Sequence, residues 1–128
     1  MKAIDDYLAA VQDVKAATLT EKIVWIRNKP NNYIFKTINH DLEDLVLSLQ
    51  RIDVDGGFEY KFGLVKQDFD NIEILLALDT STNDFELKET LTDLYNFVEY
   101  HVDIKNLDGL RDFIDAVNSG INNDTILD

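Results

Sequence analysis

The chain opens with apolar residues at the three- and four-residue spacing of a helix. The residues on one side of this pattern are Ile4, Tyr7, Leu8, Val11 and Val14. Polar and small residues occupy the other side. Residues 3–17 are therefore predicted to form an amphipathic helix.

Two more helical patterns lie near the end of the chain. The first runs from Asp84 to Val102, where Asn83 and Glu86 have the spacing of a capping box. Its predicted core stripe is Leu87, Leu91, Leu94, Tyr95, Val98 and Val102. The second pattern begins near Leu107 and ends at Gly120, a residue type that commonly closes helices. Its residues expected to point inward are Leu110, Phe113, Ile114 and Val117.

The middle of the chain favours strands. Residues 23–26 and 33–38 are β-branched and aromatic runs, and the intervening Pro30-Asn31-Asn32 segment predicts a turn. A helical continuation into the first run stays open, because Thr18 and Glu21 have capping-box spacing.

Strict alternation marks the clearest pair of strands. Residues 58–64 alternate between large apolar residues and polar residues or glycine, and residues 72–78 form a more apolar run after the turn at 67–71. These two segments are predicted to form an antiparallel hairpin. Residues 41–52 fit both structures, since Leu42, Leu45, Val46, Leu49 and Ile52 suit a helix whereas Leu45, Leu47 and Leu49 alternate as in a strand. A helix is the preferred interpretation.

The order of these elements predicts an α+β fold. We expect a single globular domain over residues 1–128, with an N-terminal helix, antiparallel β-hairpins and two C-terminal helices packed on the sheet. Residues 118–128 are expected to be a frayed tail. The length of 128 residues suits one domain. The pattern leaves the strand order open.

Charge is distributed unequally along the chain. Residues 1–66 hold 9 Lys and Arg against 10 Asp and Glu, whereas residues 67–128 hold 3 against 15. Nearly all of the net charge of −13 therefore lies in the second half. Such a field repels nucleic acids and anionic membranes and attracts basic surfaces. We expect a basic protein partner, no direct nucleic-acid or membrane contact, and a chain that is a monomer or a homodimer.

Composition also bears on compartment and chemistry. With no cysteine, the chain offers no disulfide, thiolate metal site or thiol nucleophile. Asp5 and Asp6 interrupt the first apolar stretch, where a signal peptide needs continuity. No later run has the length of a membrane span. A cytoplasmic protein is expected.

No group of residues predicts a catalytic or metal site. His40 and His101 are the only histidines, and neither belongs to a nucleophile or triad pattern. Asp53 and Asp55 bear a partial likeness to a calcium loop, but Phe58 stands where that loop requires glycine, so a hairpin turn explains them better. The sequence predicts neither an enzyme nor a cofactor.

The strongest candidate binding surface combines acids with aromatic residues. On a helical projection of residues 84–102 such a group lies opposite the leucine stripe, and the combination recurs in the turn at 67–71. Exposed aromatic residues supply binding energy, and acids steer a basic partner. The candidate partner-binding residues are Glu86, Glu89, Asp93, Phe97 and Tyr100 on the helix, and Asp68, Phe69 and Asp70 in the turn. The alternative is that Phe97 and Tyr100 pack beneath the last helix or a loop.

These features predict a small acidic binding protein that neutralises or escorts a basic partner protein. In size, charge and lack of catalytic motifs the chain is similar to bacterial toxin-immunity proteins, and that resemblance implies an inhibitor of a cationic toxin. Two alternatives stay open. One is a secretion chaperone for an effector segment, which should be a dimer with apolar patches. The other is a DNA-mimic inhibitor of a nucleic-acid-binding enzyme.

Overall fold

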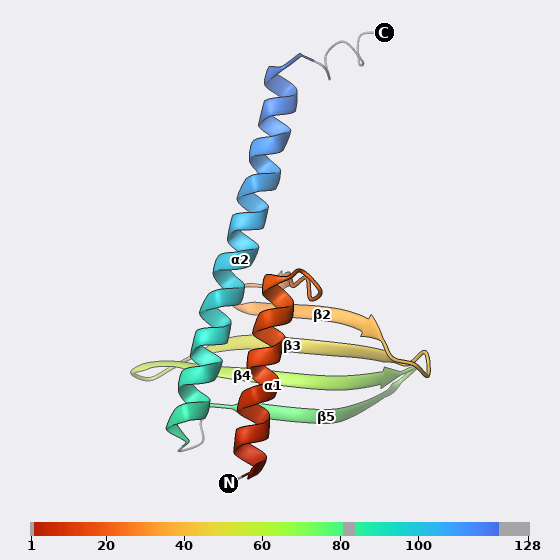
Figure 1. The fold of residues 1–128 in the computed structure, drawn as a ribbon, viewed down its shortest axis with the longest axis vertical. Coiled ribbons are helices and arrows are strands. Elements are labelled where there is room, and N and C mark those ends of the chain that lie inside the picture. Colours follow the sequence, from red (N-terminus) through yellow and green to blue (C-terminus); the bar gives the residue numbers. More distant parts are fainter. Residues whose placement is uncertain (1, 81–83, 121–128) are drawn as a thin grey trace.

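The computed structural model describes residues 2–80 and 84–120, with side chains from Asp5 onward. Its elements are α1 (Lys2–Leu19), β1 (Ile26–Lys29), β2 (Asn32–Ile38), β3 (Asp44–Val54), β4 (Gly57–Asp68), β5 (Asn71–Asp79) and α2 (Phe85–Asn118). The strands form one antiparallel sheet in the order β1-β2-β3-β4-β5, and α1 and α2 lie across the same face of it (Figure 1). The predicted α+β class is confirmed.

The preferred helix at residues 41–52 is wrong, because most of this segment belongs to β3. Leu49 is fully buried and Leu47 packs against the core, so the alternating pattern determined the structure. Leu42, which completed the helical pattern, lies in the loop before the strand and is exposed. The hairpin predicted from residues 58–64 and 72–78 is confirmed as β4 and β5.

The segment after α1 also differs from its prediction. Only Ile26 of the run at 23–26 belongs to β1, while Trp25 is buried in the core. Thr18 lies inside α1, where its hydroxyl donates to the Val14 carbonyl at 2.8 Å and accepts from Trp25 Nε1 at 2.9 Å. Thr18 therefore anchors the tryptophan and does not cap a second helix. The predicted turn between β1 and β2 is confirmed.

The core lies between the sheet and the two helices. Tyr33, Leu49, Phe62 and Leu78 are paired in register across four strands and face the helices. From α2, the Tyr95 ring packs against the rings of Tyr33 and Tyr60, at centroid distances of 5.6 and 5.2 Å. All six residues of the predicted helical core stripe are buried, namely Leu87, Leu91, Leu94, Tyr95, Val98 and Val102.

The two predicted C-terminal helices are one continuous helix of 34 residues. No proline lies within it, and its only glycine, Gly109, is tolerated. Its N-cap is Asp84, whose carboxylate accepts a hydrogen bond from Leu87 N–H at 2.8 Å. Asn83 of the predicted capping box lies outside the described residues, as do residues 121–128 of the predicted tail. Gly120 follows the C-cap with a φ of +81°, as a helix-ending glycine should.

The inward orientation expected for the last helix is wrong. The second half of α2 extends past the edge of the sheet, away from both the strands and α1 (Figure 1). Its large apolar residues are therefore exposed, namely Leu110, Phe113, Ile114 and Val117. None of the described helices is long and apolar enough to cross a membrane.

Candidate partner-binding surfaces

The predicted acidic face of α2 is only partly available to a partner. Glu86 and Glu89 are exposed, but Asp93 forms an ion pair with Lys15 of α1 at 2.7 Å. The Lys15 ammonium also lies 5.2 Å from the centre of the Phe97 ring, which is half-buried. Asp93 and Phe97 therefore hold the two helices together.

Tyr100 has a different environment from Phe97. It is 68% exposed, and the helix proposed to cover it does not exist as a separate element. Phe97 packs against α1 and stacks on His101 at a centroid distance of 5.9 Å. Of the two aromatic residues predicted on this face, Tyr100 alone presents its ring to solvent.

The turn predicted to bind a partner lies elsewhere on the molecule. Asp68, Phe69 and Asp70 connect β4 to β5 at the end of the sheet that the helices leave uncovered (Figure 1). All three are exposed, and Phe69 reaches 94%. The structure therefore does not gather the eight candidate residues into one site.

A second loop joins this turn and forms a shared surface with it. The loop between β2 and β3 borders the β4–β5 turn, and together they line an open groove of about 600 Å³. We call this surface the hairpin-end patch. It consists of Asp41, Leu42, Glu43, Asp44, Gln67, Asp68 and Phe69.

Hydrogen bonds to Asn39 shape the loop that carries Leu42. Asn39 Oδ1 accepts from the backbone N–H groups of Asp41 at 3.0 Å and Glu43 at 2.9 Å. The Asn39 carbonyl accepts from Leu42 N–H at 3.0 Å. This arrangement directs the Leu42 side chain outward, where it is 82% exposed.

Two of the four described non-glycine residues with a positive φ are the apolar residues of the hairpin-end patch, and the other two are Glu21 and Asn31. Leu42 has a φ of 63° and Phe69 a φ of 53°, in the left-handed region that favours glycine. Phe69 begins a two-residue hairpin turn, a position where glycine is the usual residue. Each such conformation costs on the order of 1–3 kcal/mol. Neither residue offsets that cost by burial, so folding alone does not explain their presence.

Charges in the hairpin-end patch divide into paired and free groups. Glu43 accepts from Asn39 and lies 3.3 Å from Lys66 Nζ, and these contacts lower the pKa of the Glu43 carboxyl. The same contact with Glu43 raises the pKa of Lys66. Within the described chain the carboxylates of Asp41, Asp44 and Asp68 form no ion pair or hydrogen bond, and all three residues are exposed. They are the charges that a basic partner would meet.

The first half of this patch was not among the predicted binding residues. The helical interpretation of residues 41–52 makes Leu42 a core residue, so it hides the loop. The signal is nevertheless present in the sequence, because Asp41-Leu42-Glu43 and Asp68-Phe69-Asp70 are both acid-apolar-acid triplets. A strand assignment for β3 would have placed both triplets at turns.

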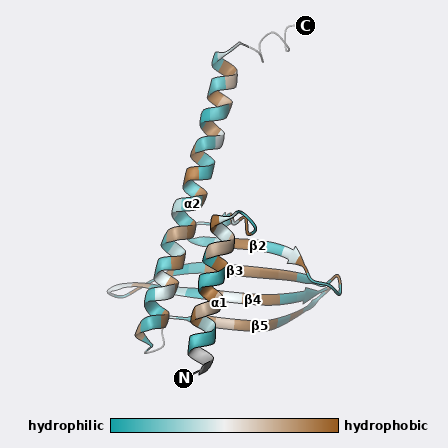
Figure 2. Ribbon diagram, viewed as in Figure 1, coloured by the Kyte–Doolittle hydropathy of each residue, from teal (hydrophilic) through white to brown (hydrophobic). Residues whose placement is uncertain are grey.

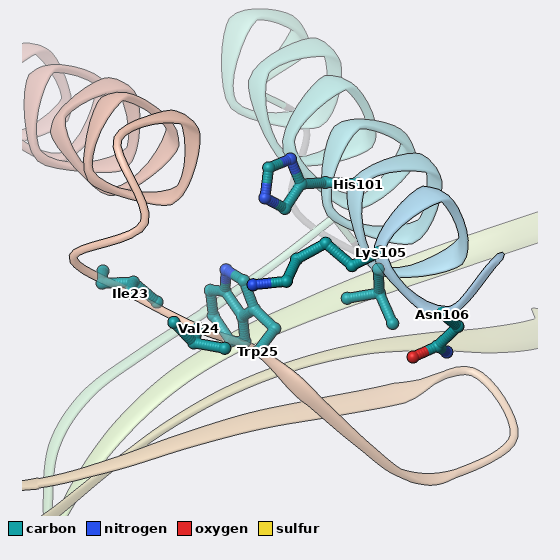
Figure 3. A pocket seen from close by; sticks show the side chains of 7 residues that line it. Ile23, Val24, Trp25, His101, Lys105 and Asn106 are labelled. Carbon is teal, nitrogen blue, oxygen red and sulfur yellow. The ribbon is translucent and has the colours of Figure 1, made fainter. Parts of the chain in front are cut away.

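An apolar pocket lies between the α1–β1 connection and α2. Figure 3 shows His101 and Lys105 reaching from α2 toward Trp25. Glu21 Oε1 accepts from Lys105 Nζ at 3.1 Å and lies 3.8 Å from His101 Nε2. The pocket volume is about 130 Å³, below the roughly 300–1,000 Å³ of typical ligand pockets. This site is a packing gap bridged by the ion pair between Glu21 and Lys105.

No metal-binding group of three or more His, Asp or Glu side chains occurs among residues 5–80 and 84–120. Comparison with protein-family models, with curated proteins and with solved structures gives no match. The surfaces described above are therefore the basis for assigning a function.

Proposed function

We propose that this chain is a protein-binding module that recognises a basic partner protein through the hairpin-end patch, and so neutralises or escorts it. The observation that carries this proposal is the pair of strained, outward-facing apolar residues, Leu42 and Phe69, set among free carboxylates. Apolar anchors surrounded by charge are the usual composition of an interface centre and its rim.

Charge and anchors have separate roles in this proposal. Asp41, Asp44 and Asp68 would speed the approach of a cationic surface, an effect that salt screens. Leu42 and Phe69 would enter apolar depressions of the partner and slow its release. Association with the partner should therefore slow as ionic strength rises, while dissociation should change little.

A displayed peptide library tests the proposal and requires no candidate partner. The wild-type chain should enrich peptides that combine Lys or Arg with large apolar residues. The double variant Phe69→Ala with Leu42→Ala should abolish that enrichment. Tyr100→Ala is the control, because it removes an exposed aromatic side chain from α2, and it should preserve the enrichment. Loss of enrichment in Tyr100→Ala alone would move the binding surface to α2.

A stability measurement separates binding residues from structural ones. Phe69→Gly should raise the free energy of unfolding by about 1 kcal/mol, because glycine adopts the left-handed conformation without steric cost. The same change should weaken partner binding. A protein destabilised by this substitution would mean that Phe69 serves the fold, contrary to the proposal.

Escort of an unfolded segment is the second candidate, and the uncovered outer face of the sheet favours it. Ile38, Ile72 and Ile74 are exposed there, and no strand of the described residues pairs with the outer edge of β5. An extended client could add to such an edge as a further strand. Ile72→Lys with Ile74→Lys should then abolish binding of unfolded basic clients, while binding through the hairpin-end patch should survive.

A further inference from the structure

The part of α2 that leaves the sheet carries an apolar surface of its own. We call residues 103–118 the distal segment, which is about 24 Å long at the usual helical rise. One side of it is apolar and is called the distal stripe: Ile104, Leu107, Leu110, Phe113, Ile114 and Val117. These six side chains are 38 to 62% exposed. Brown bands mark apolar residues along this free half of the helix in Figure 2.

The distal stripe does not continue the buried side of the helix. With about 100° of rotation per residue, its centre lies roughly 130° around α2 from the six core residues of the first half. It consequently faces away from the sheet. Within residues 5–80 and 84–120, whose side chains are described, nothing covers it.

Helix propensity argues that something does cover it. The distal segment contains Gly109, two asparagines, four aspartates and three β-branched residues, all of them weak helix formers. Its first turn is held by the ion pairs of Asp103 with Arg27 and of Lys105 with Glu21, but a helical extension of this composition beyond them is marginal in water. Burial of the distal stripe would supply the missing stabilisation.

Three properties identify the occupant as a second copy of this chain. The first is spacing, because Leu107, Leu110, Ile114 and Val117 alternate at three and four residues, as in the seam of a coiled coil. The second is area. The six side chains expose on the order of 500 Å² per copy, so complete burial in a pair would reach about 1,000 Å², the lower limit of a specific interface.

Charge placement is the third property. Three of the four aspartates of the distal segment, Asp108, Asp112 and Asp115, lie on the side of the helix opposite the distal stripe, by the same rotation per residue. The fourth, Asp103, lies on the side of the stripe, but its carboxylate pairs with Arg27. Arg111 and Asn106 flank the stripe instead. Two chains of net charge −13 repel each other, and this arrangement keeps the like charges of the distal segment apart. The same flanks offer a basic partner no carboxylate to pair with.

We propose that this protein forms a homodimer in which the distal stripes of two copies pack against each other. This proposal is independent of the hairpin-end patch, which lies on a different part of the molecule. It extends the proposed function, since a dimer would present two such patches to one partner or to two.

Mass measurement by light scattering tests the dimer. The measured mass of the wild type should be twice the chain mass of 14.7 kDa. Leu110→Asp with Ile114→Asp should weaken self-association on the order of 100-fold and give the monomer mass, because carboxylates would be buried in the seam. The matched control, Gly109→Asp with Ala116→Asp, adds the same charge to the opposite side. It should keep the dimer mass.

Single-cysteine crosslinking gives a second readout. It does not depend on whether the variant Leu110→Asp with Ile114→Asp folds. The chain has no native cysteine, so Leu110→Cys should form an intermolecular disulfide on oxidation and Ala116→Cys should not. A wild type that stays monomeric at all accessible concentrations would overturn the proposal. A dimer that survives the Asp substitutions, or that fails to crosslink through position 110, would overturn it equally, because another face would then hold the copies together.

Discussion

The two halves of α2 have similar periodicity and opposite environments. In the proximal segment, residues 85–102, six apolar residues at helical spacing are buried against the sheet and α1. In the distal segment six apolar residues at similar spacing are exposed. Periodicity therefore identifies the apolar side of a helix but does not reveal what packs against it. The two apolar stripes lie on different sides of α2, and a sheet that covers the stripe of the proximal segment cannot also cover the distal stripe.

The sharpest test of this comparison substitutes one leucine in each half. Leu91 is fully buried, so Leu91→Ala should reduce the free energy of unfolding by about 2–5 kcal/mol through lost burial and a residual cavity. Leu107→Ala should change it by no more than about 0.5 kcal/mol when measured by urea denaturation at concentrations where the chain is monomeric. Equal losses at the two positions would mean that the distal segment contacts its own core.

The loss of stability at alkaline pH should also distinguish the proximal segment of α2 from the distal segment. Burial raises the pKa of the Tyr95 hydroxyl from its usual 10.0 to about 12. The folded protein thus keeps this proton to a higher pH than the unfolded chain does. The stability associated with it is fully present below pH 10 and is lost as the pH rises through 12.

The fall between these pH values should amount to on the order of 2–3 kcal/mol, from the conversion of two pKa units to free energy. Tyr95→Phe should flatten this part of the curve of unfolding free energy against pH. Leu107→Ala, in the distal segment, should reproduce the wild-type curve. A Tyr95→Phe protein with the full alkaline loss would assign the effect to another buried phenol such as Tyr33, whose pKa is also raised by burial.

Much of the fold follows from local patterns in the sequence, and the failures have physical causes. Strict alternation predicted β4, and helical spacing predicted α1 and the core stripe of α2. Residues 41–52 were ambiguous because Leu45 and Leu49 satisfy both periods. The division of α2 into two helices was wrong because residues 103–106 contain no helix-breaking residue. Asp103, Ile104 and Asn106 are weak helix formers, and Lys105 is a good one.

The candidate site was less predictable than the fold. Sequence could place acids and aromatic residues on one helical face, but it could not show that Lys15 pairs with Asp93 across two helices. The exposure of Phe69 was predicted by its turn, whereas the pairing of that turn with the loop at Leu42 depends on strand order. Contacts between segments distant in sequence are the part that local patterns do not encode.

Substitution of two aspartates, one on each side of the last described tertiary contacts of α2, should have different effects on stability. Asp103 accepts from the Arg27 guanidinium at 2.6 Å, and the hydrogen bond of Arg27 to the Tyr33 hydroxyl, together with this contact, raises the pKa of Arg27. Because both partners are partly exposed, Asp103→Asn should reduce the free energy of unfolding by no more than about 1 kcal/mol. Asp108→Asn makes the same charge change further along the helix and should leave thermal and urea midpoints unchanged. If Asp108→Asn reduced the free energy of unfolding more than Asp103→Asn does, the tertiary contacts of α2 would extend further along the helix than Asp103.

The smallest effect on stability in dilute solution should come from a truncated chain that ends at Asn106, although truncation is the largest change to the sequence. The described contacts of α2 with β1 and with the α1–β1 connection end at Asp103 and Lys105, so this truncation removes none of the buried core. In dilute solution its urea midpoint should match that of the full chain. At higher concentrations the full chain should become more stable than the truncated one, because association stabilises the folded state by mass action. If the truncated chain unfolds in dilute solution, the proximal segment depends on the distal one, and the two halves of α2 form a single cooperative unit.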